Sequence, residues 1–237
     1  MENKKTELNI LADSLFKAGA YFGYSKSRRH PSVKEYIWGV KGNVEVFDIN
    51  RIASLLKDAE KFISKVITDG GTVLFIGTKY EARKHILNIA EEIDMPYVSD
   101  RWIGGTLTNF SEIKKRVARL EDLLNKKEKG ELAKYTKKER LLIDREIEDL
   151  ERKFGGIVSM KKIPDAVFIV DPKYEKTAVY EALQMNIPII AIASSDCDIS
   201  KINYPIVAND ASGRSIKALI GEIASALKNT IKGESTQ

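Results

Sequence analysis

Three short apolar runs constrain the fold of this chain more than any other feature of its sequence. They lie at residues 72–76, 166–170 and 188–192, and polar residues hardly interrupt them. Strands that are continuously apolar are covered on both faces, as in a parallel sheet. Stretches with helical periodicity, at residues 80–93 and 174–185, follow two of the runs. The sequence therefore predicts a three-layer α/β domain around a mainly parallel sheet.

Weaker patterns complete the predicted domain. Apolar residues recur at helical spacing in residues 6–18, 50–69 and 212–231, which predicts three amphipathic helices. Short strands are predicted at residues 36–40, 44–49, 95–98 and 204–207, and a turn at 41–43 joins the first two of them. We interpret residues 19–35 as a loop and residues 232–237 as a flexible tail.

Residues 109–153 break the alternation of strands and helices. Between residues 111 and 153, 14 side chains are basic and 11 are acidic, and no strand pattern occurs. The apolar side chains recur with heptad-like spacing on two arms. They are Ile113, Val117, Leu120 and Leu124 on the first arm, and Leu142, Ile143, Ile147, Leu150 and Phe154 on the second. We predict an antiparallel coiled-coil helical hairpin at 109–153, inserted in an α/β domain made of residues 1–108 and 154–231.

Basic residues are concentrated in two parts of the chain. Lys and Arg number 39 against 34 Asp and Glu, and the excess lies in residues 1–40 and 101–153. Two basic patches on a neutral scaffold are what a protein that binds a phosphate backbone needs. On charge alone, a solvated surface with a small lysine bias fits equally well.

Seven basic side chains in these regions are our candidates for contacts with RNA phosphates. They are Lys26, Arg28, Arg29, Lys114, Lys115, Arg116 and Arg119, and the second choices are Lys126, Lys127, Lys134, Lys137 and Lys138. The first three lie among aromatic residues such as Tyr24 and Trp38. Arginines interleaved with aromatic rings can clamp phosphates and stack on unpaired bases. In the alternative interpretation, the rings belong to the core and the cations are merely solvated.

The sequence offers no convincing catalytic constellation. The turn Gly77-Thr78-Lys79 lies between a predicted strand and helix, where phosphates can bind. However, the glycine patterns of a P-loop and of a dinucleotide-binding turn are both missing. The histidines, His30 and His85, have no nucleophile motif near them in sequence. We therefore expect no enzymatic activity and no bound cofactor.

The loops near the predicted strand ends contain three aspartates and one cysteine. Asp196, Asp198 and Asp210 could bind Mg²⁺ or could cap turns, and we favour capping. Cys197 is the only cysteine, which excludes an internal disulfide and favours a buried, inert thiol. We therefore predict no metal site.

Neither a membrane segment nor a secretory signal is expected. The longest apolar run, residues 187–193, is far shorter than the roughly 20 residues that span a bilayer. The N-terminus leads into an amphipathic pattern instead of an apolar signal core. We expect a cytoplasmic protein with no membrane partner.

Several motifs resemble one family. Residues 101–110 read Arg-Trp-Ile-Gly-Gly-Thr-Leu-Thr-Asn-Phe, residues 75–79 read Phe-Ile-Gly-Thr-Lys, and residues 154–157 read Phe-Gly-Gly-Ile. In these motifs the chain resembles the second protein of the bacterial small ribosomal subunit, and the likeness extends in order from about residue 8 to residue 231. Some loops depart from the family pattern, for example at Tyr21 and Tyr24, where the family has histidines.

The resemblance implies a flavodoxin-like domain with an inserted coiled-coil hairpin and a structural role without catalysis. It also implies binding to small-subunit ribosomal RNA and to neighbouring ribosomal proteins near the junction of head and body. One implied neighbour is the large, multi-domain protein that recruits messenger RNA. The alternatives are a flavodoxin-like protein that binds a nucleotide or flavin, and a coiled-coil adaptor that binds only protein.

Overall fold

A five-stranded parallel sheet forms the centre of the protein. The computed structural model describes residues 2–234, and the side-chain surroundings of residues 8–228. The strands are β4 (Val73–Ile76), β5 (Tyr97–Val98), β6 (Ala166–Val170), β7 (Ile189–Ala193) and β8 (Tyr204–Val207). Their order is β5-β4-β6-β7-β8, and every neighbouring pair is parallel. All residues of β4, β6 and β7 are buried, which confirms the prediction from the apolar runs.

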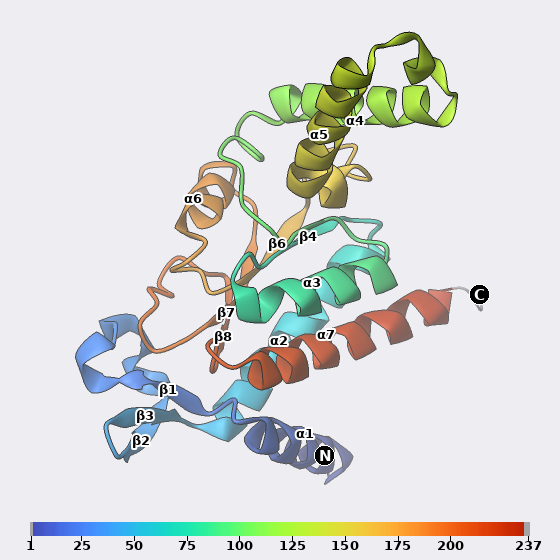
Figure 1. Cartoon of the computed structure of the whole chain (residues 1–237). Helices are drawn as coiled ribbons and strands as arrows, with labels where there is room; N and C mark the ends of the chain where they lie inside the picture. The colour runs from blue at the N-terminus through green and yellow to red at the C-terminus, as the bar shows by residue number, and fades with distance from the viewer. Residues whose placement is uncertain (1, 235–237) are drawn as a thin grey trace.

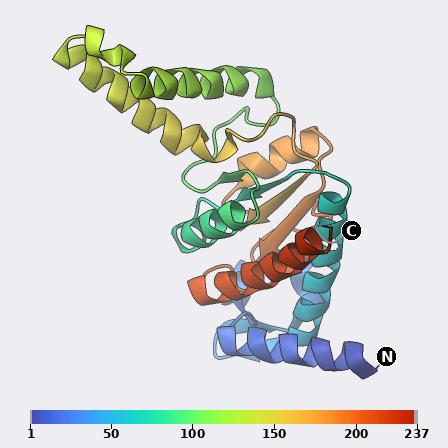
Figure 2. The same cartoon turned by 90° about the vertical axis from the view of Figure 1, so that its right-hand side faces the viewer.

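Helices cover both faces of this sheet. Helix α3 (Tyr80–Glu92) packs against α7 (Gly213–Glu234), and α7 packs against α2 (Ile49–Thr68). Helix α6 (Lys176–Gln184) lies on the opposite side of the sheet (Figures 1 and 2). This three-layer, flavodoxin-like arrangement confirms the predicted fold class. Helix α7 continues three residues beyond the predicted end at residue 231, and the rest of the predicted tail, 235–237, lies outside the described residues.

A second, antiparallel sheet follows the N-terminal helix α1 (Glu2–Ala18). Its strands are β1 (Phe22–Ser25), β2 (Ile37–Lys41) and β3 (Val44–Phe47), in the order β1-β3-β2. The predicted β2–β3 pair is confirmed, but the interpretation of residues 22–25 as loop is wrong. Strand β1 pairs with β3, some 20 residues ahead in the chain, and its ladder is irregular. Tertiary pairing therefore overrides a local pattern that contains a glycine and a serine.

The N-terminal sheet is tied to the parallel sheet by hydrogen bonds. The short 3₁₀ segments η1 (Lys26–Arg28) and η2 (Pro31–Tyr36) connect β1 with β2. The Tyr24 backbone N–H donates to Ser195 Oγ at 2.8 Å, and the His30 N–H donates to the Ser195 carbonyl at 2.8 Å. The Asn209 N–H donates to the Ala20 carbonyl at 2.8 Å. These bonds fix residues 26–30, which we call the basic loop, against the loops that follow β7 and β8.

Two long helices project from the body as a hairpin (Figures 1 and 2). They are α4 (Phe110–Glu128) and α5 (Lys137–Phe154), joined by the 3₁₀ turn η3 (Glu131–Lys134), and a further turn η4 (Gly155–Ile157) leads back to the body. Thr136 and Glu139 form a capping box that starts α5. Within the described residues, no helix is long and apolar enough to span a membrane.

The seam of the hairpin differs from the predicted one at two leucines. Leu124 and Leu142 are 40% and 54% exposed, whereas Leu123 is buried. Adjacent positions on a helix point about 100° apart, so sequence spacing alone did not decide that Leu123 and not Leu124 faces the partner helix. On α5, Leu141 is exposed as well as Leu142. The remaining seam includes buried Leu120 and Ile147. The division of the chain into domains at residues 109 and 153 stays a prediction.

Candidate nucleic-acid interface

Two segments, residues 101–109 and 155–157, connect the body of the protein with the hairpin, and we call them the joint. One buried carboxylate holds the first of these segments. Glu181 of α6 accepts hydrogen bonds from the Trp102 indole at 3.1 Å and from the Gly105 backbone at 2.8 Å. Its other oxygen accepts from the Leu107 N–H at 3.0 Å, and from the Thr108 N–H and hydroxyl at 3.3 Å each. Burial opposes ionisation, but these donors together outweigh it and lower the pKa of the Glu181 carboxyl. The segment that leads into α4 is therefore fixed to α6.

The second segment of the joint, which follows α5, is fixed by close backbone packing. A side chain at Gly156 would overlap the carbonyl oxygen and the ring of Tyr97. Only glycine permits this approach. Residues 101–110 stand out in the sequence, whereas the role of Glu181 as their acceptor was not predicted. The available signal was a lone acidic side chain on the inward face of a helix whose neighbours Ala178 and Ala182 are apolar.

Two of the predicted RNA-binding residues on α4 are available for a ligand. Lys114 and Arg116 are exposed, and neither is in an ion pair within the described part of the chain. The Lys114 ammonium lies 5.2 Å from the centre of the Phe110 ring, a weak contact that leaves the charge in solvent. Both side chains can therefore contact phosphate.

The other two predicted residues on α4 are engaged. Lys115 pairs with Glu112 at 2.6 Å on the exposed surface, an interaction of about 0–1 kcal/mol that phosphate can replace. Arg119 donates two hydrogen bonds to Glu146 of α5, at 2.9 and 3.1 Å. This two-point contact links the two helices. We therefore assign Arg119 to the stability of the hairpin in preference to RNA binding.

The second-choice lysines divide in the same way. Lys126 pairs with Asp122 at 2.6 Å, and Lys127 pairs with Asp144 at 2.7 Å. The remaining three are exposed around the turn of the hairpin: Lys134, Lys137 and Lys138. Arg101, at the joint, is also exposed and was missed by the sequence analysis, although it is the only charged residue of the motif at 101–110.

The basic loop presents two cations and uses the third internally. Lys26 and Arg28 are exposed, and the Arg28 guanidinium lies 5.5 Å from the centre of the Tyr24 ring. Arg29 instead pairs at 3.3 Å with Glu45, whose side chain is fully buried. The two carboxylate oxygens of Glu45 accept no hydrogen bond within the described part of the chain. Arg29 is therefore the counter-ion of a buried carboxylate, a role that the sequence did not predict.

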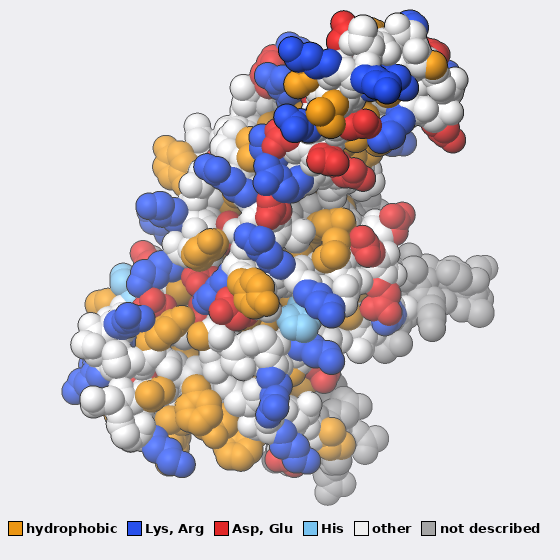
Figure 3. Space-filling model, in the orientation of Figure 1, with side chains coloured by type: hydrophobic (Ala, Val, Ile, Leu, Met, Phe, Trp, Pro, Cys, Tyr) orange, Lys and Arg blue, Asp and Glu red, His pale blue; other side chains and the backbone are white. Residues whose placement is uncertain are grey.

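The two basic regions lie at different ends of the molecule. The hairpin projects from one end, and the basic loop lies beside the N-terminal sheet at the other (Figure 1). Figure 3 shows Lys and Arg side chains over the hairpin and again around the N-terminal sheet, with mixed charges between them. The arrangement suits an extended ligand that reaches both regions.

The strand-to-helix turn after β4 is filled by the chain's own carboxylates. The Thr78 N–H and hydroxyl both donate to buried Glu175, at 2.8 and 2.6 Å. The Lys79 ammonium lies 2.9 Å from Asp171 and 3.6 Å from Asp210. A bound phosphate would need these same donors and would face three carboxylates. The geometry therefore disfavours the nucleotide-binding alternative.

A possible cation-binding group lies at the same edge of the sheet. Asp171, Cys197 and Asp210 place ligand atoms within 4.8 Å of one another. Burial, and then Asp210 and Asp171, raise the pKa of the Cys197 thiol, so it is protonated and a poor ligand at neutral pH. Burial, and then Asp171, raise the pKa of Asp210. Lys79 already supplies a positive charge here, so the residues form an internal ion network.

The three aspartates of the sequence analysis therefore have different roles. Asp198 accepts from the Ser200 N–H and hydroxyl at 3.0 and 2.7 Å, which confirms the predicted cap of a turn. Asp196 pairs with Lys173 at 2.7 Å. Asp210 is completely buried in the ion network, which the prediction of a cap did not anticipate. Cys197 is buried, as predicted.

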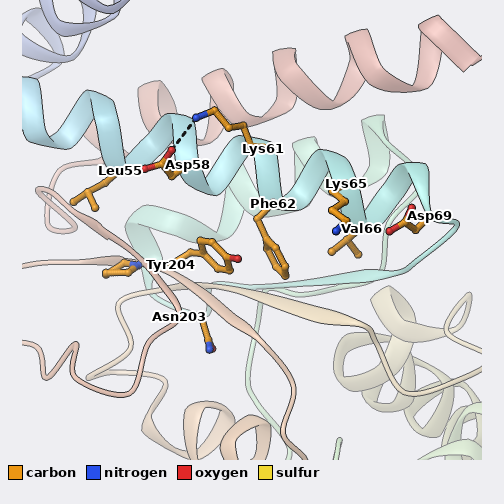
Figure 4. A pocket seen from close by; sticks show the side chains of 10 residues that line it. Leu55, Asp58, Lys61, Phe62, Lys65, Val66, Asp69, Asn203 and Tyr204 are labelled. Atoms are coloured by element: carbon orange, nitrogen blue, oxygen red, sulfur yellow. Dashed lines mark hydrogen bonds and ion pairs between the residues drawn. The ribbon is translucent and has the colours of Figure 1, made fainter.

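A groove of about 730 Å³ runs between α2 and the edge strand β8 (Figure 4). The rings of Phe62 and Tyr204 stack on each other there, with centres 4.2 Å apart. Lys61 is paired with Asp58 at 2.9 Å, and the other lysine and aspartate of the groove balance in charge. The two rings thus stack on each other and not on a ligand, and the groove has no net charge that would attract phosphates. We therefore do not assign the groove to RNA.

The sequence of this chain matches a known protein family. A sequence model of the family described as ribosomal protein S2 matches residues 15–230 of this chain. The matched range includes the parallel sheet, the joint, the whole hairpin and the basic loop.

Proposed function

This chain belongs to the ribosomal protein S2 family, and we propose that it binds small-subunit ribosomal RNA through its hairpin and its basic loop. The family makes it a structural protein of the small ribosomal subunit. In this proposal it acts without catalysis, on cytoplasmic ribosomes near the junction of head and body. Its proposed neighbours are other small-subunit proteins, including the large protein that recruits messenger RNA, and its role is to support assembly and translation.

The observation that supports RNA binding best is a set of exposed, unpaired cations on a fixed support. Lys114 and Arg116 are free within the described part of the chain, and the segment that precedes them is held by Glu181. Lys26 and Arg28 form a second such group on the loop tied to Ser195. Pre-positioned cations lose little conformational entropy when they meet phosphates. Both groups are therefore suited to contact the phosphates of RNA.

The test is the salt dependence of binding to small subunits from which this protein has been stripped. Each phosphate contact contributes about 0.7–0.9 to the slope of log affinity against log salt concentration. We expect Lys114→Ala/Arg116→Ala to reduce that slope by up to about two, since it removes two contacts. Lys61→Ala/Lys65→Ala is the matched control, because it removes two exposed charges from the neutral groove on α2.

Equal slopes for the wild-type chain and the hairpin variant would contradict the assignment of these two residues. Rebinding that survives ribonuclease digestion of the subunit, and that is lost only on deletion of the hairpin, would favour the adaptor alternative.

A further inference from the structure

Large apolar side chains are exposed on the N-terminal part of the molecule, and the proposed function uses none of them. Trp38 of β2 is 79% exposed, and Phe16 of α1 and Val40 of β2 are more than half exposed. With the partly buried Tyr21 they form what we call the aromatic patch. Figure 3 shows hydrophobic side chains gathered over α1 and the N-terminal sheet, with Lys and Arg side chains at their border.

The aromatic patch lines a cavity of about 340 Å³. Val46, Phe47 and Ile49 also line it. The rings of Phe16 and Tyr21 stack with centres 4.6 Å apart and an interplanar angle of 10°. The Trp38 indole stacks on no other ring within the described residues, so its face is free. The cavity has the size of a small ligand site and flat aromatic side chains at its edge.

The walls of the cavity come from secondary structure that is fixed by pairing. Strand β2 is paired with β3, with Gly39 opposite Val46 and Val40 opposite Glu45. The start of α2 is fixed by Asp48, which accepts from the Asn50 N–H at 3.0 Å. A ligand would therefore meet a preformed site.

The charged groups at the cavity favour an anionic ligand that also has a flat apolar face. Lys41 lines the cavity and is exposed. This lysine is in no ion pair within the described part of the chain. The one carboxylate in the lining, Asp48, is engaged as the cap of α2. An apolar peptide segment would leave the Lys41 ammonium group without a partner, whereas a nucleotide offers it a phosphate and offers the Trp38 indole a base.

We propose that the aromatic patch binds an unstacked base of single-stranded ribosomal RNA, with the base on the Trp38 indole and the adjoining phosphate at Lys41. The inference rests on the proposed function, to which it adds a third contact region. It differs from the other two because it recognises the base as well as the backbone.

Rebinding to stripped small subunits separates the two kinds of contact. Loss of a base stack weakens binding by about tenfold, so we expect Trp38→Ala to bind about tenfold more weakly with an unchanged salt slope. Trp38→Phe should retain most of the affinity, because it keeps an aromatic face. Lys41→Ala should instead lower the slope by about one. Tyr180→Ala is the matched control, since Tyr180 is an aromatic residue 67% exposed outside the patch.

Ultraviolet crosslinking of rebound subunits identifies what lies on the patch. Trypsin releases residues 35–41 as one peptide containing Trp38, and we expect a nucleotide adduct on it. Wild-type rebinding with no loss for Trp38→Ala overturns this inference alone. A crosslink from this peptide only to a protein neighbour also overturns it, in favour of a protein partner. Failure of the wild-type chain to rebind overturns the proposed function together with it.

Discussion

Replacing Glu181 with alanine is expected to destabilise the protein and release the hairpin. The substitution leaves the Trp102 indole N–H and the Leu107 N–H buried without an acceptor. An unsatisfied buried donor costs about 1–3 kcal/mol, so these two groups cost about 4 kcal/mol together. The Gly105 and Thr108 donors are only partly buried, and water can satisfy them. For a chain of this size, the loss corresponds to a fall in Tm of about 10 °C.

Thermal and urea unfolding followed by circular dichroism measure the loss of stability. Distances between spin labels on α4 and α6 measure the orientation of the hairpin, and we expect their distribution to broaden. Glu121→Ala is the matched control, because Glu121 is an exposed carboxylate on α4 that should contribute less than about 0.5 kcal/mol. A loss below about 1 kcal/mol for Glu181→Ala, with an unchanged distance distribution, would refute the role of this carboxylate in holding the joint.

Two further predictions concern buried charges. Arg29→Ala should lower the free energy of unfolding by about 3 kcal/mol, measured in urea, because it leaves Glu45 buried without a counter-ion. The double variant Arg29→Ala/Glu45→Gln should recover more than half of that loss. Equal losses in the single and double variants would argue against this role of Arg29. The pKa of the Asp210 carboxyl is raised from about 4 to about 7 in the native state. The native state therefore binds the carboxyl proton more tightly than the unfolded state does. The stability that this group contributes falls as the pH rises from 4 to 7. Asp210→Asn should therefore flatten the dependence of Tm on pH between 4 and 7, whereas a curve parallel to that of the wild type would disprove the assignment.

The core of the fold could be predicted because burial on both faces leaves a direct trace in the sequence. The runs that form β4, β6 and β7 contain apolar residues at nearly every position, and every residue of these three strands is buried. Strand β1 left no such trace. It is four residues long, it has no buried residue, and it exists because β3 offers it a ladder. Its existence depends on tertiary pairing that local periodicity does not encode.

The candidate site was predictable in its charge but not in its partners. Composition located both basic regions, and exposed Lys114, Arg116, Lys26 and Arg28 fit that expectation. Sequence spacing could not show that Arg29 faces a buried carboxylate, because Glu45 reaches it through the fold of the N-terminal sheet.

The role of Glu181 was hidden for the same reason. Its donors lie more than 70 residues earlier in the chain. Pairings of this kind depend on the packing of distant segments, so only the structure reveals them.

Sedimentation of a tagged copy of the full chain tests the central claim most directly. A lysate is fractionated on sucrose gradients at low and high salt, and the chain is detected across the fractions. Our account predicts that the chain sediments with the small ribosomal subunit at low salt and is released progressively as salt rises, because phosphate contacts are screened and replaced by ions. A chain that stays with free proteins at the top of the low-salt gradient would contradict the proposed binding to ribosomal RNA.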